Sequence, residues 1–322
     1  MNSSVQADTI VFSFVATGCN RVDQKDVTND NPSTANLVQL KRTFSDILAL
    51  RPVPRFFFFT GDMVVGYTND TDILKSQLSA WTILYEQSGL RAAGVSLVPL
   101  PGNHETLPGK GLPASLAAER IWLNVMKPYI QNNNGPKIGE ADNLSTDESQ
   151  ITYSFDYVNT HFLVLNTDGP GKESQVPYRW ISADLESARK NGAKHMIAFS
   201  HKPAFPYPQE DGLSSNLSAR DSFWNALEVN HAELLISAHN HLYYRVQPNT
   251  GKTWQIIAGN GGSSLSALIN SSDQQFFGFC LVNIYQSGKI LLKSYGRKTP
   301  SAGYLESTDN ISTLLKDSLI IQ

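Results

Sequence analysis

The chain has 322 residues, which is enough for one large domain with a sizeable core. Its 41% hydrophobic and 17% charged residues are typical of an ordinary globular protein. A formal net charge of -3, without any run of Lys or Arg, argues against a nucleic-acid-binding surface. No apolar segment approaches the roughly 20 residues that span a bilayer, so we expect no transmembrane segment.

The first half of the chain alternates between predicted strands and helices. Apolar runs of strand length end at polar clusters, and the segments between them have the apolar spacing of amphipathic helices. The predicted strands are 10–16, 55–59 and 95–100, and the predicted helices are 34–50, 72–91 and 114–126. This β-α-β-α-β order indicates an α/β fold with parallel strands.

The second half begins with a predicted surface loop and then contains mostly strands. The loop, 131–150, is rich in Asn, Gly, Asp and Ser. The predicted strands are 151–157, 161–166, 194–200, 233–237, 243–246, 254–258, 276–285 and 289–295, and the predicted helices are 178–191 and 220–230. We find no internal repeat and no linker, so we expect a single domain over 1–322. Its core would be about 10–296, with a C-terminal extension over 297–322.

The two cysteines and the N-terminus say little about the location of the protein. Cys19 and Cys280 cannot form a disulfide framework, and the sequence does not show whether they meet. The polar start before the first predicted strand is compatible with the removal of an export signal and equally with a native start.

Five polar clusters follow predicted strands, and four of them supply Asp, Asn and His. The clusters are Thr17-Gly18-Cys19-Asn20-Arg21, Gly61-Asp62, Gly102-Asn103-His104-Glu105, Ser200-His201 and Ala238-His239-Asn240-His241. Ligands of open α/β sheets gather beyond the carboxyl ends of the strands, so these side chains can converge in one cleft. Carboxylate, amide and imidazole ligands together suit zinc, iron or manganese. The candidate ligands are Asp62, Asn103, His201, His239 and His241.

A histidine taken singly is a weaker signal of a metal site than the five clusters together. His239 and His241 alternate along a strand end, so both face the site only if the backbone turns there. Otherwise they are two solvated histidines in a surface loop. Three further histidines stand alone and are predicted to be strand or helix-edge residues: His161, His195 and His231.

Over about 10–296 the clusters resemble the motifs of the calcineurin-like metallophosphoesterase family, which includes purple acid phosphatases and cyclic-nucleotide phosphodiesterases. The family pattern is D-x-H, G-D, G-N-H-[DE], H and G-H-x-H, and Ala238 replaces the glycine of the last motif. The resemblance implies a four-layer α-β-β-α sandwich, in which two mixed sheets are flanked by helices. It also implies a cofactor of one or two metal ions, zinc, iron or manganese.

The resemblance assigns a role to each matching residue. Asp62 would bridge two metals, while Asn103, His201 and His239 would complete the second site. His241 would belong to the first site. His104 would be the catalytic residue, which donates a proton to the leaving oxygen or stabilises the phosphoryl charge. Asn103 would also contact the substrate.

The first motif departs from the family, because its aspartate falls on Cys19 and its histidine on Arg21. Cys19 could bind a metal as a thiolate, which prefers zinc or iron, or it could be a small buried hydrophobe. Arg21 cannot lose its proton and cannot be a ligand. It could supply a fixed positive charge and bind the phosphate of the substrate, or form a surface salt bridge with Asp23 or Asp26.

The resemblance implies a metal-dependent hydrolase of phosphomonoesters or phosphodiesters that uses a metal-bound hydroxide. The expected partner is a phosphorylated small-molecule substrate, without any nucleic-acid polymer. The altered first motif favours an alternative, a catalytically weak or inactive relative that binds phosphate, a ligand or a partner. Family habit favours a periplasmic or extracellular location.

Overall fold

The computed structural model describes residues 8–21, 37–208, 211–248, 251–266, 268, 271, 273–297 and 311–322. Asp23 and Asp26, the predicted salt-bridge partners of Arg21, lie outside these ranges. The first three residues of the helix predicted at 34–50 also lie outside them.

The first sheet combines the N-terminal and C-terminal parts of the chain in the order β14-β13-β12-β1-β2-β3. Its strands are β1 (Ile10–Thr17), β2 (Phe56–Thr60), β3 (Ser96–Leu100), β12 (Phe277–Tyr285), β13 (Ile290–Arg297) and β14 (Leu314–Ile321). β1, β2 and β3 are parallel, as their predicted helical crossovers require, and β12, β13 and β14 are antiparallel to their neighbours. The sheet is therefore mixed.

The second sheet has the order β10-β11-β9-β8-β5-β4. Its strands are β4 (Tyr153–Tyr157), β5 (Thr160–Leu165), β8 (His195–Ser200), β9 (Leu234–Ser237), β10 (Tyr243–Val246) and β11 (Trp254–Ala258). β5, β8, β9 and β11 are parallel, while β4 and β10 pair antiparallel at the two edges.

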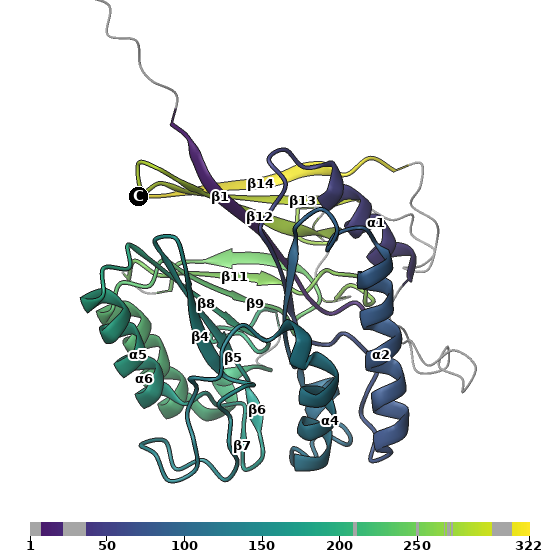
Figure 1. The fold of residues 1–322 in the computed structure, drawn as a ribbon, viewed down its shortest axis with the longest axis vertical. Coiled ribbons are helices and arrows are strands. Elements are labelled where there is room, and N and C mark those ends of the chain that lie inside the picture. The colour runs from purple at the N-terminus through teal and green to yellow at the C-terminus, as the bar shows by residue number, and fades with distance from the viewer. Residues whose placement is uncertain are drawn as a thin grey trace, which may run out of the picture.

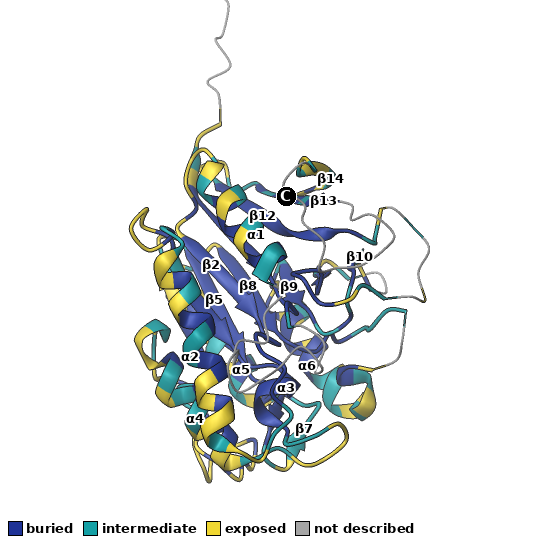
Figure 2. Ribbon diagram, turned by 90° about the vertical axis from the view of Figure 1, so that its right-hand side faces the viewer, coloured by how far each residue is buried: buried dark blue, intermediate teal, exposed yellow. Residues whose placement is uncertain are grey.

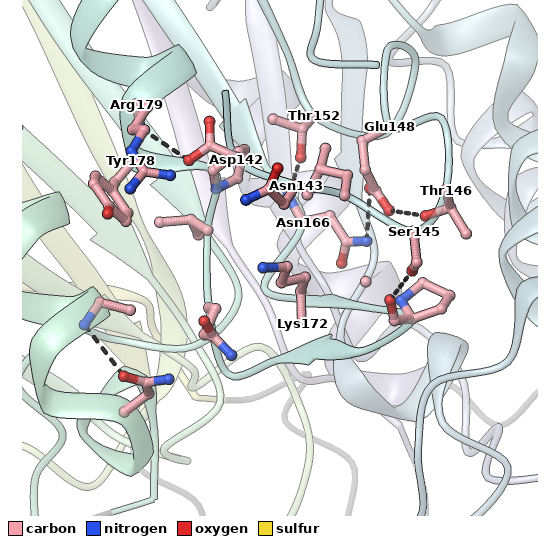
Figure 3. Close-up of a pocket in the computed structure, with 18 of the residues that line it drawn as sticks. Asp142, Asn143, Ser145, Thr146, Glu148, Thr152, Asn166, Lys172, Tyr178 and Arg179 are labelled. Carbon is pink, nitrogen blue, oxygen red and sulfur yellow. Dashed lines mark hydrogen bonds between the residues drawn. The ribbon is translucent and has the colours of Figure 1, made fainter. Parts of the chain in front are cut away.

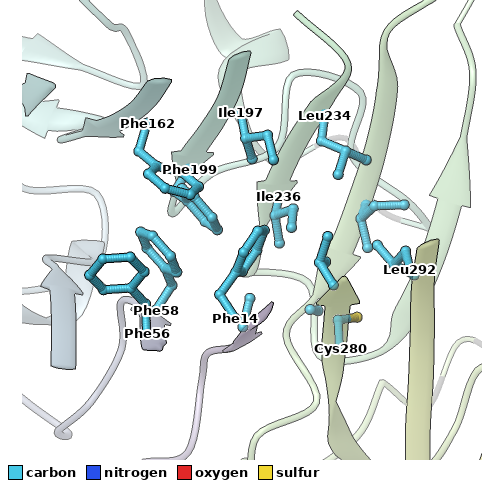
Figure 4. Close-up of a cluster of buried hydrophobic side chains, with 14 of the residues drawn as sticks. Phe14, Phe56, Phe58, Phe162, Ile197, Phe199, Leu234, Ile236, Cys280 and Leu292 are labelled. Carbon is cyan, nitrogen blue, oxygen red and sulfur yellow. The ribbon is translucent and has the colours of Figure 1, made fainter. Parts of the chain in front are cut away.

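The two sheets pack face to face through an aromatic-rich core (Figure 4). Phe58 of β2 stacks on Phe199 of β8 with ring centroids 3.8 Å apart and an interplanar angle of 5°. Phe14 of β1 and Phe162 of β5 meet edge-on at 5.5 Å. Cys280 also lies in this core. The central strands β2, β5, β8 and β9 are buried on two faces (Figure 2), whereas the edge strand β14 is partly exposed.

Helices cover the outer faces of both sheets, and the predicted four-layer sandwich is confirmed (Figure 1). On the first sheet lie α1 (Leu37–Ala49), α2 (Thr71–Gln87) and α4 (Leu116–Met126), and on the second lie α5 (Tyr178–Lys190) and α6 (Leu217–Val229). Apolar side chains of each helix face the sheet. Leu40 and Phe44 of α1, for example, pack with Phe57 and Phe59 of β2.

Some short elements were not predicted. These are α3 (Asn103–Thr106), the 3₁₀ turns Lys127–Tyr129 and Leu213–Asn216, and the hairpin of β6 (Asp168–Gly169) with β7 (Lys172–Glu173). β14 was also missed, and it places residues of the predicted C-terminal extension at the edge of the first sheet. None of the helices in the described part of the chain has the length and apolar character that crossing a membrane requires.

Candidate metal centre

The predicted site residues follow the carboxyl ends of β1, β2, β3, β8 and β9. These ends meet at one edge of the sandwich because the strands are parallel neighbours within their sheets. Asp62, which follows β2 in the first sheet, has its Oδ1 atom 3.2 Å from Nε2 of His201, which follows β8 in the second sheet. Residues about 140 positions apart therefore form one cluster.

His201 points an unprotonated ring nitrogen at this cluster. Its Nδ1–H donates to the carbonyl oxygen of Thr60 at 2.8 Å, and a carbonyl only accepts hydrogen bonds. Burial lowers the pKa of the ring to about 4, so the neutral ring carries a lone pair on Nε2. This Nε2 faces Oδ1 of Asn103 at 2.9 Å and Oδ1 of Asp62 at 3.2 Å.

His239 also lies against this group. Its Nε2 faces the Asp211 carboxylate at 3.2 Å, so in the neutral ring Nε2 carries the proton and Nδ1 carries the lone pair. This Nδ1 lies 3.0 Å from Oδ1 of Asn103 and 3.1 Å from Nε2 of His201. The backbone of His239 has φ of 66°, in the left-handed region. This is the turn that the sequence required if His239 and His241 were both to face the site.

Four donor atoms gather around Nε2 of His201. Asn103 Oδ1, His239 Nδ1 and Asp62 Oδ1 lie 2.9, 3.1 and 3.2 Å from it, and Asn103 Oδ1 lies 3.0 Å from His239 Nδ1. Ligands at about 2.0–2.1 Å from a zinc-like ion stand roughly 2.9–3.4 Å apart in octahedral or tetrahedral geometry. Acceptors that face one another without a hydrogen between them repel, and a cation removes that repulsion. We call these four residues the second-site cage.

Tyr67 and Asp211 hold the side chains of Asn103 and His239 in the cage, and no sequence motif predicts either residue. The Asn103 side-chain amide nitrogen donates to the Tyr67 hydroxyl, which turns Oδ1 of Asn103 into the cage. The Tyr67 ring lies against the His104 ring with centroids 3.7 Å apart. Asp211 holds His239 as described above. Carboxylates and hydroxyls behind the ligands commonly fix ligand orientation in metal sites.

Arg21 lies where the resemblance places the first metal, between Asp62 and His241. Its Nε is 3.4 Å from Oδ2 of Asp62, and its Nη1 is 3.1 Å from Nε2 of His241. Nη1 also donates to Ser263 Oγ at 3.2 Å. Since Nδ1–H of His241 donates to the Ser264 carbonyl, its Nε2 accepts from Arg21. A guanidinium thus meets two predicted first-site ligands.

His104 is beside the cage, as the resemblance implies, but its ring is held by two hydrogen bonds. Nδ1–H donates to the Val65 carbonyl, and Nε2 accepts from Nε–H of Arg21 at 2.9 Å. Burial lowers the pKa of His104 to about 3, so the ring is neutral. In this arrangement Nε2 of His104, the nitrogen nearest Asp62, carries no proton.

Cys19 is fully buried beside Asp62 and has φ of 57°. Its Sγ accepts the His239 backbone N–H at 3.2 Å and lies 3.9 Å from Oδ2 of Asp62. Ligand atoms of Cys19, Asp62 and His201 lie within 4.8 Å of one another, which is close enough to share an ion. Burial raises the pKa of the thiol well above its usual range, so without a cation Cys19 is a neutral buried group.

The carboxyl group of Asp62 stays ionised at the centre of the site. Burial by itself raises its pKa. The imidazoles of His201 and His104, which are charged at the low pH where Asp62 would take up a proton, and the Arg21 guanidinium lower the pKa by more, to below its usual range. The backbone of Asp62 has φ of 54°, and its N–H donates to Glu105.

Close backbone approach explains two small residues at the site. A Cβ on Gly61 would stand 2.6 Å from Nδ1 of His201, so no larger residue fits there. A Cβ on Gly18 would stand 2.7 Å from the Cβ of Ala238. Because Gly18 has no side chain, the site accepts Ala238 in place of the glycine of the family motif.

The three isolated histidines lie in or beside regular elements: His161 and His195 are in strands, and His231 follows a helix. His161 of β5 contacts Asp156 and Asp184, and His195 of β8 contacts Glu233. His231 is exposed after α6. The two cysteines are both free, and Cys280 lies in the core between the sheets.

A sequence model of the calcineurin-like phosphoesterase family matches residues 26–243, which begins just after the altered first motif. No curated protein matches the chain. Similar solved structures include a purple acid phosphatase from yellow lupin (Lupinus luteus) seeds, at 18% identity and a TM-score of 0.64. That match covers 96% of this chain and 53% of the lupin enzyme, so the chain spans about half of its length.

Two further structures share the fold. A dimetal phosphatase from Danio rerio is 14% identical, with a TM-score of 0.58 and coverage of 89% of this chain and 97% of that one. GAP50 of Plasmodium, described as the anchor in the inner membrane complex, is 15% identical, with a TM-score of 0.51 and coverage of 89% and 85%. With the family model matching well over half of the sequence, the chain belongs to the calcineurin-like phosphoesterase family.

Proposed function

We propose that the protein hydrolyses phosphate esters with one metal ion in the second-site cage and with Arg21 in the place of the first metal. The observation that carries this proposal is the set of four converging lone pairs beside a guanidinium. A cation in the cage would lower the pKa of a bound water and neutralise charge on the phosphoryl oxygens.

Arg21 supplies the charge that a second metal would otherwise provide. Its contacts to the described residues use Nε and Nη1, so Nη2 is the nitrogen that we expect to meet a phosphoryl oxygen. A guanidinium matches phosphate geometry and keeps its charge at every physiological pH. It cannot activate water, however, and we therefore expect slower hydrolysis than at a two-metal site.

A second candidate is a relative that binds phosphate or a partner without turnover. The state of His104 favours it, because a ring that accepts from Arg21 has no proton on Nε2 for a leaving group. One structural neighbour is described as an anchor, and a binding role of that kind is the form this candidate would take.

The test combines metal content with hydrolysis. We expect about one Mn or Zn ion per chain by elemental analysis. We also expect slow release of nitrophenol from p-nitrophenyl phosphate or its diester, abolished by EDTA and by Asp62→Asn. Without hydrolysis by the wild type under any metal, the second candidate holds.

Restoring the family's first motif gives a sharper comparison. The double variant Cys19→Asp, Arg21→His supplies the two missing ligands next to Asp62 and His241 and frees His104. We expect metal content to rise to about two ions per chain and hydrolysis to increase at least tenfold. If the double variant gains neither metal nor rate, then Arg21 does not stand in for a metal ion.

A further inference from the structure

A cavity of about 260 Å³ lies between the loop 142–148, the β6–β7 hairpin and the first turns of α5 and α6 (Figure 3). No residue of the second-site cage lines it, and neither does Arg21 or His104. Sites for small molecules have volumes of roughly 300–1,000 Å³. This cavity is slightly smaller than that range, so it suits a small metabolite. It is separate from the metal centre.

Two cationic side chains line the cavity. Lys172 of β7 is half-buried, and its amino group has no hydrogen bond or ion pair with any residue that the structure describes. Figure 3 shows it among the other lining side chains, near Asn166. Arg179 of α5 lies over the Tyr178 ring at 5.2 Å and donates from Nη1 to the Ala141 carbonyl at 2.6 Å. A guanidinium has further N–H donors for a ligand.

The carboxylates in the cavity wall are already used. Asp142 accepts the backbone N–H groups of Arg179 at 3.1 Å and Trp180 at 2.9 Å, at the start of α5. Glu148 accepts from Thr146 at 2.9 Å and from Asn166 at 3.1 Å. The charge in the cavity that lacks a partner is therefore positive.

Glu148 lies beside Glu119, because both buried carboxyl groups accept from the Asn166 amide nitrogen at 3.1 Å. Burial, and then the charge of Glu148, raise the pKa of Glu119 to about 10. The pair therefore shares a proton at neutral pH and offsets less of the positive charge than two carboxylates would.

Neutral polar groups make up most of the remaining lining. Within the described ranges, the side chains of Asn143, Gln175, Tyr178 and Ser218 have no hydrogen bonds to protein. Amides and hydroxyls that both donate and accept suit ligand hydroxyl groups. An apolar ligand would leave these groups and the Lys172 charge without partners, at a cost in free energy.

We propose that this cavity binds a small hydroxylated organic anion, either a sugar acid or a sugar phosphate. Lys172 and Arg179 meet its anionic group, and the amide and hydroxyl side chains meet its hydroxyl groups. The proposal does not depend on hydrolysis at the metal centre.

Calorimetric titration of the purified full chain with gluconate, glucose 6-phosphate and glucose tests the proposal. At least one of the two anions should bind at least tenfold more tightly than glucose, and which one binds separates a carboxylate ligand from a phosphate ligand. Lys172→Met should weaken that binding at least tenfold, whereas Lys75→Met, an exposed lysine on α2, should not change it.

Two further variants locate the binding. Ser218→Trp, at an exposed position in the first turn of α6, should fill the cavity and abolish binding without removing a charge. Asn103→Ala, in the second-site cage, should leave it intact. Melting temperatures verify that each variant is folded. The proposal is wrong if neither anion binds, if glucose binds equally well, if Lys75→Met matches Lys172→Met, or if Asn103→Ala abolishes binding.

Discussion

At the scale of single residues, the altered first motif changes which atoms carry positive charge at the site. Arg21 replaces a neutral ligand with a permanent cation and contacts Asp62, His104 and His241 at once. Cys19 keeps a small group at the end of β1, and its Sγ holds the backbone of His239. The Arg21 guanidinium lies between Asp62 and His241, so a second metal ion cannot occupy the same place while Arg21 is there.

Tyr67 should be a positioning residue for the cage. Tyr67→Phe removes the acceptor for the Asn103 amide, so the amide can rotate and present nitrogen instead of oxygen. Losses of this kind typically weaken metal binding 10- to 100-fold. Competition with a chromogenic chelator for Mn or Zn measures the dissociation constant, with Tyr129→Phe on the protein surface as the control. An unchanged dissociation constant for Tyr67→Phe would remove Tyr67 from this role.

His161 should make stability depend on pH. Burial by itself lowers its pKa, but hydrogen bonds to Asp184 and Asp156 raise the pKa above 6.5. A group whose pKa is raised on folding stabilises the fold fully below its unfolded pKa. That stabilisation is lost as the pH rises through the folded pKa.

The difference in free energy of unfolding between wild type and His161→Gln measures this effect. We expect about 1–3 kcal/mol near pH 6, as for hydrogen bonds to charged groups, and a smaller difference at pH 9. Urea unfolding at both pH values gives the two numbers. A difference that is the same at pH 6 and pH 9 would contradict the assignment of a charged His161.

At the scale of elements, Glu105 links the loops that carry the site. From α3 it accepts the backbone N–H groups of Asp62 at 2.9 Å, Val64 at 3.0 Å and Gly102 at 2.7 Å. Its side chain is fully buried, so these three donors have no water as an alternative partner. The loop after β2 is thereby held against the loop after β3.

Glu105→Gln should therefore destabilise the fold and loosen the site. A glutamine amide turns an NH₂ group toward one of the three N–H donors, and an unsatisfied buried donor costs about 1–3 kcal/mol. Thermal and urea unfolding should show this loss, while Glu186→Gln on the exposed face of α5 should change stability by less than about 0.5 kcal/mol. Equal stabilities of the two variants would mean that Glu105 does not link these loops.

The sequence predicted the elements that are strongly patterned and missed those that are not. Continuous apolar runs predicted β1, β2, β8 and β9 to within one or two residues, because strands buried on both faces contain few polar residues. β6 and β7 have two residues each and leave no periodic signal. β14 contains Lys316, Asp317 and Ser318, since an edge strand is partly exposed, and so it was not distinguished from an extension.

The candidate site divides in the same way. Convergence of Asp62 with His201 follows from strand order, which the sequence pattern reveals. The contacts of Arg21, Tyr67 and Asp211 depend on side-chain directions in loops, and these are set by tertiary packing. The left-handed backbone at His239 gave no signal either, because it is held by the Cys19 contact from the other end of the chain.

At the scale of the whole molecule, the site exists only while the two sheets are packed together. Asp62 and Asn103 come from the first sheet, whereas His201 and His239 come from the second. The stacked pair of Phe58 and Phe199 joins the sheets beneath them (Figure 4). Metal binding and sheet packing should therefore be linked, so that a bound ion raises the free energy of unfolding of the entire sandwich.

Phe199→Ala tests whether the sandwich unfolds as one unit. Deleting a fully buried phenyl ring should cost about 3–5 kcal/mol, whereas Val229→Ala, at an exposed position of α6, should cost less than about 0.5 kcal/mol. Urea unfolding of the wild type and of Phe199→Ala, followed by tryptophan fluorescence and by circular dichroism, should give coincident transitions for each protein. The stabilisation that Mn or Zn confers should be lost in that same transition. A double-mutant cycle with Phe58→Ala should give a coupling of about 0.5–1.5 kcal/mol for the stacked rings. Two separate transitions would mean instead that each sheet, with its helices, folds independently and that the cage assembles only after the sheets dock.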